Sequence, residues 1–220
     1  MTRTPFADRA AAGRLLAGRV AALRLTPPVV VLALPRGGVP VAAEVARALG
    51  APLDLVLVRK VGVPWQPELA LAALVDGDPP ECVIDDEVQR LCGLERAQID
   101  ALAAREHAEL ARRRERYLRG RAPRPLAGAT AVVVDDGIAT GTTMRAALVA
   151  LRRRGPARLV LAVPVAPQDT LTALRAEVDD IVCLATPQPF RAVGLHYADF
   201  HQVDDAEMLA ALHAAQAAPG

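Results

Sequence analysis

The sequence predicts an α/β fold, with a central, mostly parallel sheet flanked by helices. Residues 29–34, 53–58 and 131–134 are apolar runs with the length of buried strands. A helical pattern separates the first two runs, and a strand–helix–strand order favours parallel pairing through a right-handed crossover. The chain has 220 residues, of which 52% are hydrophobic, which is enough for one core. We therefore expect residues 1–220 to form a single domain.

Other elements continue the alternation. Near the N-terminus, Leu16, Val20 and Leu23 share one face of an expected surface helix. A second helix over residues 41–49 ends at Gly50, because glycine readily adopts the left-handed conformation found after a helix. Downstream, the pattern predicts a helix to about residue 154, a strand at 159–165, a helix at 167–178, a strand at 181–184 and a helix at 204–214.

Three segments interrupt this alternation. Residues 61–80 are rich in glycine and proline, and we expect a loop there, with at most a short strand or helix at 68–75. Residues 85–119 are helical in pattern and heavily charged, which predicts a helical insertion over the strand ends. Residues 186–204 contain half of the six Phe, Tyr and Trp side chains and are expected to form a small hood.

The strongest chemical signal lies between Ala131 and Met144. A buried strand ends in the adjacent carboxylates Asp135 and Asp136, and a turn rich in glycine and threonine leads into a helix. The unpaired N–H groups of a helix start, together with threonine hydroxyls, can bind a phosphate. The carboxylates would repel phosphate, but they can accept hydrogen bonds from neighbouring sugar hydroxyls or face a cation. The segment therefore predicts a sugar-phosphate site.

Two common phosphate-binding motifs do not match this segment. No lysine follows Gly141, as a P-loop requires, and the dinucleotide-binding G-x-G-x-x-G pattern is absent. The run V-V-D-D-G-I-A-T-G-T-T at 133–143 instead resembles the phosphoribosyl-diphosphate signature of type I phosphoribosyltransferases. The resemblance implies that Asp135 and Asp136 contact the ribose hydroxyls. It further implies a 5-phosphate loop formed by Gly137, Ile138, Ala139, Thr140, Gly141, Thr142 and Thr143.

A second short motif, Pro35-Arg36-Gly37-Gly38, follows the first predicted strand. Open parallel sheets bind ligands at the carboxyl ends of their strands, and an arginine beside exposed backbone N–H groups suits a diphosphate. A tight turn with a solvated arginine is the alternative. With Leu34, the motif resembles the diphosphate-binding loop of 6-oxopurine phosphoribosyltransferases. This resemblance implies diphosphate contacts from Arg36, Gly37 and Gly38, and a cis peptide bond between Pro35 and Arg36.

Arg59 and Lys60 follow the strand expected at 53–58, and Lys60 is the single lysine in the chain. They could add positive charge to the diphosphate site, and a solvated strand end is the alternative. Residues 61–80 resemble, in position only, the mobile loop that closes over the reaction in this family. Such a loop would exclude water from a positively charged sugar.

Phe190 and Val193 are the candidate acceptor-binding residues. Their segment resembles the C-terminal base-binding segment of 6-oxopurine phosphoribosyltransferases, which implies that Phe190 stacks on the acceptor. Core packing is the alternative for this ring. Those enzymes carry a third carboxylate at the position that Ala139 occupies here. Proton exchange with a 6-oxopurine at that position is therefore not expected, and the acceptor stays open.

A dense run of arginines ends the expected insertion. Glutamates interleave with the run and stacking aromatics are lacking, so we expect a solvated helix face, with an anionic substrate or RNA as the alternatives. The run comprises Arg112, Arg113, Arg114, Arg116, Arg119, Arg121 and Arg124.

Net charge, hydrophobic runs and cysteine spacing bear on the partners and the cellular location of the protein. A formal net charge of +1 gives no overall attraction to nucleic acid or membrane, and no apolar run reaches the roughly 18 residues of a membrane span. Cys82, Cys92 and Cys183 lack metal-ligand spacing, so we expect reduced thiols in a cytoplasmic protein.

Taken together, the resemblances imply a phosphoribosyltransferase. It would move the 5-phosphoribosyl group from phosphoribosyl diphosphate to a nitrogenous acceptor such as a nucleobase, with release of diphosphate. Asp135, Asp136 and Lys60 would be catalytic, and Mg²⁺ would bridge diphosphate and ribose oxygens without dedicated protein ligands. The alternatives are a regulatory protein that binds phosphoribosyl diphosphate without turnover, and an α/β phosphohydrolase or nucleotide-binding enzyme. The expected partners are small molecules, a homo-oligomer is an open option, and nucleic acid and membrane are not expected.

Overall fold

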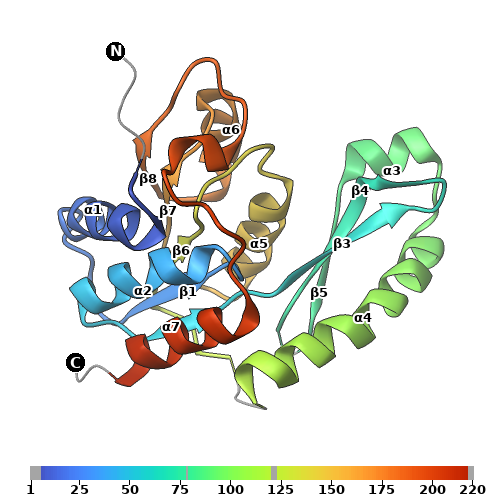
Figure 1. Cartoon of the computed structure of the whole chain (residues 1–220). Helices are drawn as coiled ribbons and strands as arrows, with labels where there is room; N and C mark the ends of the chain where they lie inside the picture. The colour runs from blue at the N-terminus through green and yellow to red at the C-terminus, as the bar shows by residue number, and fades with distance from the viewer. Residues whose placement is uncertain (1–5, 78, 120–122, 218–220) are drawn as a thin grey trace.

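The fold is built around a five-stranded parallel sheet (Figure 1). The computed structural model describes residues 6–77, 79–119 and 123–217. The strand order is β2-β1-β6-β7-β8, and each neighbouring pair is parallel. The predicted fold class is therefore confirmed. The strands are β1 (Val29–Ala33), β2 (Leu53–Leu55), β6 (Thr130–Val134), β7 (Arg158–Val165) and β8 (Asp180–Ala185).

Helices cover both faces of this sheet (Figure 1). Successive side chains of a strand point to opposite faces, and the central strand β6 is buried throughout because both of its faces are covered. Val132 packs in one apolar cluster and Val133 in another. The first cluster includes side chains of α1 (Arg9–Ala21), α2 (Gly38–Leu49) and α7 (Asp205–Ala217), and the second includes those of α5 (Thr142–Arg153) and α6 (Gln168–Leu174).

A second sheet lies to one side of the five-stranded sheet and packs against α5 of the core (Figure 1). It is antiparallel, with the order β3-β4-β5, and consists of β3 (Val58–Val63), β4 (Gln66–Val75) and β5 (Glu81–Ile84). Two helices follow it, α3 (Asp86–Cys92) and α4 (Arg96–Leu118), and we call residues 58–118 the insertion module. Leu71 and Leu74 of β4 are fully buried in one cluster with Ile99 of α4, so the long helix packs along the sheet. Among the described residues, no helix combines the length and apolarity needed to cross a bilayer.

The prediction of a loop at 61–80 is wrong, because most of this segment is strand, but the short strand allowed for at 68–75 is confirmed as part of β4. Its glycines and prolines suggest breaks in the sequence pattern, but they lie where antiparallel strands accept them. Gly62 lies at a register shift, and a Cβ there would overlap with the backbone of Pro67. Pro64 lies in the turn between β3 and β4. The segment that resembles a mobile closing loop in position is therefore an antiparallel hairpin of β3 and β4.

The segment between β8 and α7 lies over one end of the core sheet and holds the short 3-10 helix η2 (Val193–His196). Phe6, near the N-terminus, forms an isolated parallel bridge with Tyr197, and the N–H of Ala198 donates to Phe6 O at 2.7 Å. The start of the described chain is therefore tied to the hood, beside the carboxyl ends of the strands. A further short 3-10 helix, η1 (Arg175–Glu177), follows α6.

Candidate active site

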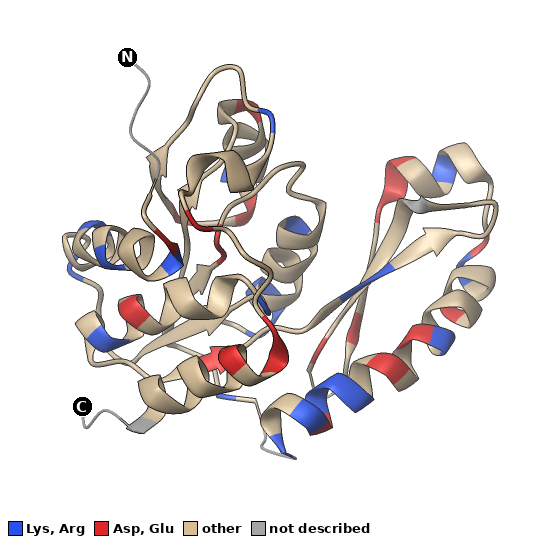
Figure 2. Cartoon of the chain, in the orientation of Figure 1, with Lys and Arg blue, Asp and Glu red and all other residues tan. Residues whose placement is uncertain are grey.

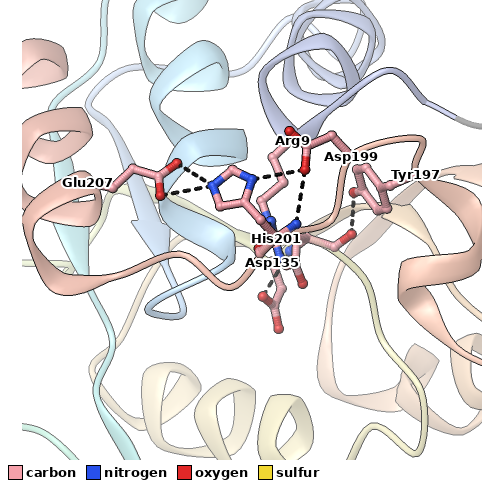
Figure 3. A network of polar contacts seen from close by, with 7 residues as sticks. Arg9, Asp135, Tyr197, Asp199, His201 and Glu207 are labelled. Atoms are coloured by element: carbon pink, nitrogen blue, oxygen red, sulfur yellow. Dashed lines mark hydrogen bonds and ion pairs between the residues drawn. The ribbon is translucent and has the colours of Figure 1, made fainter.

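Two adjacent carboxylates, Asp135 and Asp136, follow β6 at the carboxyl edge of the parallel sheet. The backbone N–H of Asp136 donates to Asp135 Oδ1 at 2.8 Å. Arg9 Nε donates to Asp136 Oδ2 at 2.7 Å, in an ion pair whose side chains are only 9% and 13% exposed. The Tyr197 hydroxyl donates to the backbone oxygen of Asp136 at 2.5 Å (Figure 3). Each carboxylate is thus held in a defined orientation.

Burial raises the pKa of both carboxyl groups. For Asp135 the pKa lies well above its usual range, because burial and then the negative charge of Asp136 disfavour the ionised form. Burial also raises the pKa of Asp136, and the ion pair with Arg9 opposes this effect. Burial and the nearby Asp136 raise the pKa of Tyr197, so its hydroxyl stays a donor. A positive charge brought beside the pair would favour two ionised carboxylates, so the site suits a cation or an electron-poor sugar.

The predicted phosphate loop, residues 137–143, connects β6 to α5. The N–H of Ile138 donates to Val165 O at 3.0 Å, which anchors the loop to the end of β7. Gly141 precedes α5 with a φ of 81°, a conformation that favours glycine. The N-cap of α5 makes no side-chain hydrogen bond, so the N–H groups of the first turn remain available to an anion. Residues 140–142 line a cleft of about 660 Å³ between the core and the insertion module.

The predicted diphosphate loop, residues 35–38, lies directly against the carboxylates. The peptide bond between Pro35 and Arg36 is cis, as the resemblance implied. A Cβ on Gly37 would overlap with the carboxylate of Asp136, and a Cβ on Gly38 would lie 2.9 Å from a backbone oxygen of β6. Glycine is required at both positions because the two loops approach so closely. The acidic motif and the R-G-G motif, far apart in sequence, therefore form one site.

The predicted position of Arg59 and Lys60 at the end of a core strand is wrong. The insertion module already begins at Val58, so both residues lie inside the antiparallel sheet. Arg59 Nη2 pairs with Glu106 Oε2 of α4 at 2.5 Å. Lys60 is exposed, and both side chains line a small cavity with Arg113 and the start of α5. Their charges thus reach the edge of the site from the insertion module, not from the core sheet.

The hood, residues 186–204, contacts the phosphate loop through Val193. A Cβ on Gly137 would overlap with the side chain of Val193, so the two are in contact. Phe190 stacks on His196, with ring centroids 5.6 Å apart and an interplanar angle of 24°. Ala139 is exposed in the loop, and its methyl group offers no proton-transfer chemistry.

Comparison with known proteins identifies the family to which this geometry belongs. Residues 8–199 match the model of the phosphoribosyl transferase domain. The chain belongs to this family. Proteins of two Mycobacterium tuberculosis strains, CDC 1551 / Oshkosh and ATCC 25618 / H37Rv, are 51% identical over 207 residues and carry a provisional phosphoribosyl transferase name. The match covers 94% of this chain and 46% of theirs, so the chain spans about half the length of these curated relatives.

The phosphoribosyl transferase domain has a close structural match that includes the insertion module. The crystal structure of TT1426 from Thermus thermophilus is 47% identical, with a TM-score of 0.83. The match covers 94% of this chain and 97% of that chain. So little of either chain is left out that most of residues 58–118 must belong to the shared fold.

Arg9 was not predicted from the sequence, and it closes this candidate site of the phosphoribosyl transferase domain from the N-terminal helix. Besides its pair with Asp136, Arg9 donates from Nη1 to His201 O at 2.8 Å, and its Cζ lies 3.9 Å from the ring centroid of Phe200. One signal was available in the sequence. Arg9 is the first residue of α1, where a cation opposes the helix dipole and therefore needs a compensating partner.

An exposed histidine network adjoins the site (Figure 3). His201 Nδ1 lies 3.0 Å from Asp199 Oδ1, and its Nε2 lies 3.0 Å from Glu207 Oε1. Hydrogen bonds to Asp199 and then Glu207 raise the pKa of His201 and favour its charged form. The network links the end of the hood to the first turn of α7, and so fixes the segment that carries the Arg9 acceptor oxygen.

The expectation that the arginine run forms a solvated helix face holds only in part. Arg114 turns to the second sheet and pairs with Asp76 at 3.0 Å, while Arg121 lies outside the described residues. Blue residues gather at the end of α4 that approaches the core (Figure 2). A cavity of about 570 Å³ lies there, between the diphosphate loop and α4, and its arginines are Arg36, Arg112, Arg113 and Arg116.

Proposed function

We propose that this protein transfers the 5-phosphoribosyl group of phosphoribosyl diphosphate to a nitrogen of a small acceptor and releases diphosphate. The observation that carries the proposal is the contact between the two loops. Gly37 of the diphosphate loop lies against the Asp136 carboxylate, and Arg36 of the same loop lines one cavity with Thr143 in the uncapped first turn of α5. One extended ligand with a phosphate, a diol and a diphosphate would satisfy all three parts.

The carboxylates would act on the ribose. Ionised Asp135 and Asp136 accept hydrogen bonds from the 2- and 3-hydroxyls and stabilise the positive charge that develops on the sugar. Residues 137–143 would hold the 5-phosphate through backbone N–H groups and threonine hydroxyls. At the other end, Arg36, Gly37 and Gly38 would hold the diphosphate. The sequence-based assignment of Arg59 and Lys60 to the same group stays a prediction, and for Arg59 the ion pair with Glu106 argues against it.

The protein side chains at this site would suit Mg²⁺ that keeps most of its water ligands. The carboxylates of Asp135 and Asp136 are hard oxygen donors, although Arg9 already occupies one oxygen of Asp136. Among the described residues, no group of three or more potential ligand side chains could hold a metal by itself. Most contacts to the ion would therefore come from donor oxygens and water. When bound, it would neutralise charge on the departing diphosphate.

The acceptor would enter from the hood side, where Val193 contacts Gly137. Phe190 lies on the same side, but its ring stacks on His196 and packs against the apolar cluster of Ala12, Val165 and Tyr197, so stacking on the acceptor stays a prediction for this residue. The bond between the acceptor nitrogen and ribose C1 forms as the bond between C1 and the diphosphate oxygen breaks. The electron pair of the broken bond leaves with the diphosphate. A proton on the acceptor nitrogen passes to water or to the diphosphate, because Ala139 has no group that could receive it.

The first test is donor binding in the presence of Mg²⁺, measured by isothermal titration calorimetry. The double variant Asp135→Asn/Asp136→Asn should lose phosphoribosyl diphosphate binding while it keeps a native circular dichroism spectrum. The matched control is Asp179→Asn/Asp180→Asn, an adjacent aspartate pair at the amino end of β8, which should bind like the wild type. Equal affinity in the two double variants would contradict the site assignment.

The second test is turnover. Diphosphate release should be followed with phosphoribosyl diphosphate, Mg²⁺ and a panel of nucleobases and small aromatic acids. Release that depends on one acceptor class identifies the reaction. Tight donor binding without release for any acceptor would favour the regulatory alternative, in which the protein binds the donor without turnover.

A further inference from the structure

The cavity beside the diphosphate loop carries an excess of positive charge. Its charged lining comprises four arginines, Arg36, Arg112, Arg113 and Arg116, and two acids, Glu109 and Asp205. Three of the arginines come from α4, and only Arg36 belongs to the diphosphate loop. The arginines outnumber the acids by two, so the cavity attracts anions.

Each acid in the cavity is shared by two arginines. Glu109 pairs with Arg112 at 2.6 Å and with Arg113 at 3.2 Å. Asp205 pairs with Arg116 at 2.6 Å, but its contact with Arg36 is long, at 3.4 Å. A guanidinium has five N–H donors, so these pairs leave much of the donor capacity unused.

Arginines at this spacing reach the cavity together. Side chains four residues apart lie on the same helix face, so Arg112 and Arg116 form one row, and Arg113 borders it. Arg114 points elsewhere, to Asp76 of the second sheet. Arg114 therefore belongs to the face of α4 that packs on the second sheet, whereas Arg112, Arg113 and Arg116 belong to the face that lines the cavity.

We propose that the insertion module completes the diphosphate site. Arg112, Arg113 and Arg116 form the wall opposite Arg36 and bind the diphosphate group of the donor and of the released product. This inference rests on the proposed function. Paired phosphates suit such a cavity because planar guanidinium groups donate two hydrogen bonds to phosphate oxygens from several directions.

Asp205 competes with the diphosphate for the same arginines. Its carboxylate accepts from Arg36, from Arg116 and from the Tyr117 hydroxyl at 2.9 Å. Figure 2 shows red residues at the start of α7, across from the blue end of α4. Diphosphate carries more negative charge than one carboxylate, so it displaces Asp205 from Arg36 and Arg116. Without diphosphate, Asp205 holds these two arginines in place, and its competition lowers diphosphate affinity.

RNA is a poorer match for these arginines. Proteins that bind single strands use exposed aromatic rings for base stacking, whereas Tyr117, the aromatic residue that lines this cavity, is buried and engaged with Asp205. The arginines are largely exposed, but they line one cavity between the diphosphate loop and α4. A compact anion therefore fits them better than a polymer.

The test uses inorganic diphosphate with Mg²⁺ as the probe and measures its affinity by calorimetry. Arg112→Gln/Arg113→Gln should lower the affinity about tenfold or more, since hydrogen bonds to charged groups are lost. The matched control is Arg19→Gln/Arg47→Gln, two exposed arginines of α1 and α2 that line none of the cavities described above. This control should change the affinity less than about twofold.

A third variant should change the affinity in the opposite direction. Asp205→Asn removes the competing charge but keeps an oxygen acceptor for Tyr117, and it should bind diphosphate about three- to tenfold more tightly. A purely structural role for the Asp205 contacts would predict no gain. Unchanged affinity in both Arg112→Gln/Arg113→Gln and Asp205→Asn would overturn the inference.

Two further ligands separate this inference from the proposed function. Ribose 5-phosphate lacks the diphosphate, so its affinity should be equal in the wild type and in Arg112→Gln/Arg113→Gln. Arginine-dependent binding of diphosphate without any binding of phosphoribosyl diphosphate would support the cavity and contradict the donor. Donor binding that is insensitive to the arginine substitutions would support the proposed function and overturn the inference. Simultaneous binding of diphosphate and donor would also overturn it, because the two should compete.

Discussion

The two walls of the proposed donor site are built in different ways. On the core wall, Asp135 and Asp136 follow a fully buried strand, and nearly buried partners hold the acidic pair. On the insertion wall, arginines of α4 are largely exposed and share their acids. The core wall is therefore preorganised for one ligand geometry, whereas the insertion wall supplies charge that can rearrange. Ribose recognition needs the first property, and capture and release of a diphosphate benefit from the second.

The same contrast separates two ion pairs. Arg9 and Asp136 are almost excluded from water, while Arg59 and Glu106 of the insertion module are 31% and 29% exposed. Breaking a buried pair leaves an uncompensated charge, but breaking an exposed pair leaves two solvated side chains. Substitutions in the two walls should therefore differ in size and in what they affect.

The largest effect is expected for Arg9→Gln. It leaves Asp136 buried without its charged partner, which should lower the free energy of unfolding by about 3 kcal/mol at neutral pH. Loss of Arg9 also raises the pKa of Asp136 further, because Arg9 is what opposes the effect of burial. The stability loss should therefore shrink at a pH below 3.8, the ordinary value for aspartate, where Asp136 is protonated in both the folded and the unfolded chain. Urea unfolding at neutral pH and below pH 3.8 measures both quantities. A loss that does not change with pH would argue against the buried pair.

Asp135→Asn should separate binding from stability. Donor affinity should fall about 100-fold, since charged acceptors for the ribose diol are lost. Stability should rise at neutral pH, because the folded-state pKa of Asp135 lies above 3.8 and burying its charge costs free energy. Between 3.8 and the raised pKa the native state binds more protons than the unfolded chain, so wild-type stability falls as pH rises through that window. The gain from asparagine should thus be present at neutral pH and vanish below pH 3.8. A variant less stable than the wild type at neutral pH would contradict this account.

Gly37→Ala tests the contact between the two motifs. The new Cβ would overlap with the Asp136 carboxylate, so either the diphosphate loop or the carboxylate must move. A displacement of about 1 Å in a binding site can cost up to about 100-fold, and we expect donor affinity to fall about 10- to 100-fold.

Two glycine controls localise this effect. Gly18→Ala places its Cβ in open space on α1 and should leave binding intact while it stabilises the helix by up to about 1 kcal/mol. Gly62→Ala overlaps with the backbone of Pro67 in the insertion module and should leave ribose 5-phosphate affinity unchanged. Equal donor affinity in Gly37→Ala and Gly18→Ala would show that donor binding does not depend on the close contact between the two loops.

The core wall could be predicted from sequence because its parts are contiguous. A buried run, two acids, a glycine-rich turn and the start of a helix all occur between Ala131 and Met144, and the R-G-G motif follows the neighbouring strand. The parallel sheet then brings the two strand ends together without further information. Local sequence therefore suffices for this wall.

The rest depends on tertiary contacts that leave little local trace. Arg9 and its partner Asp136 are 127 positions apart. The second sheet escapes prediction because Gly62 and Pro64 look like breaks until their register and turn positions are known. The arginines of α4 resemble a solvated face because they interleave with glutamates, and only the position of α4 beside the diphosphate loop gives them a cavity.

The smallest effect is expected for Arg59→Gln. The pair with Glu106 is partly solvated, so its loss should cost less than about 1 kcal/mol of stability. Diphosphate affinity should change less than about twofold, because the guanidinium is turned to Glu106 and Arg59 does not line the larger arginine cavity. The sequence-based assignment of Arg59 to the diphosphate predicts instead a loss comparable to that of Arg112→Gln. Titration of both single variants with diphosphate decides between the two. A loss at Arg59 that equals the loss at Arg112 would extend the insertion wall to β3 and remove the distinction between a packing pair and a binding arginine.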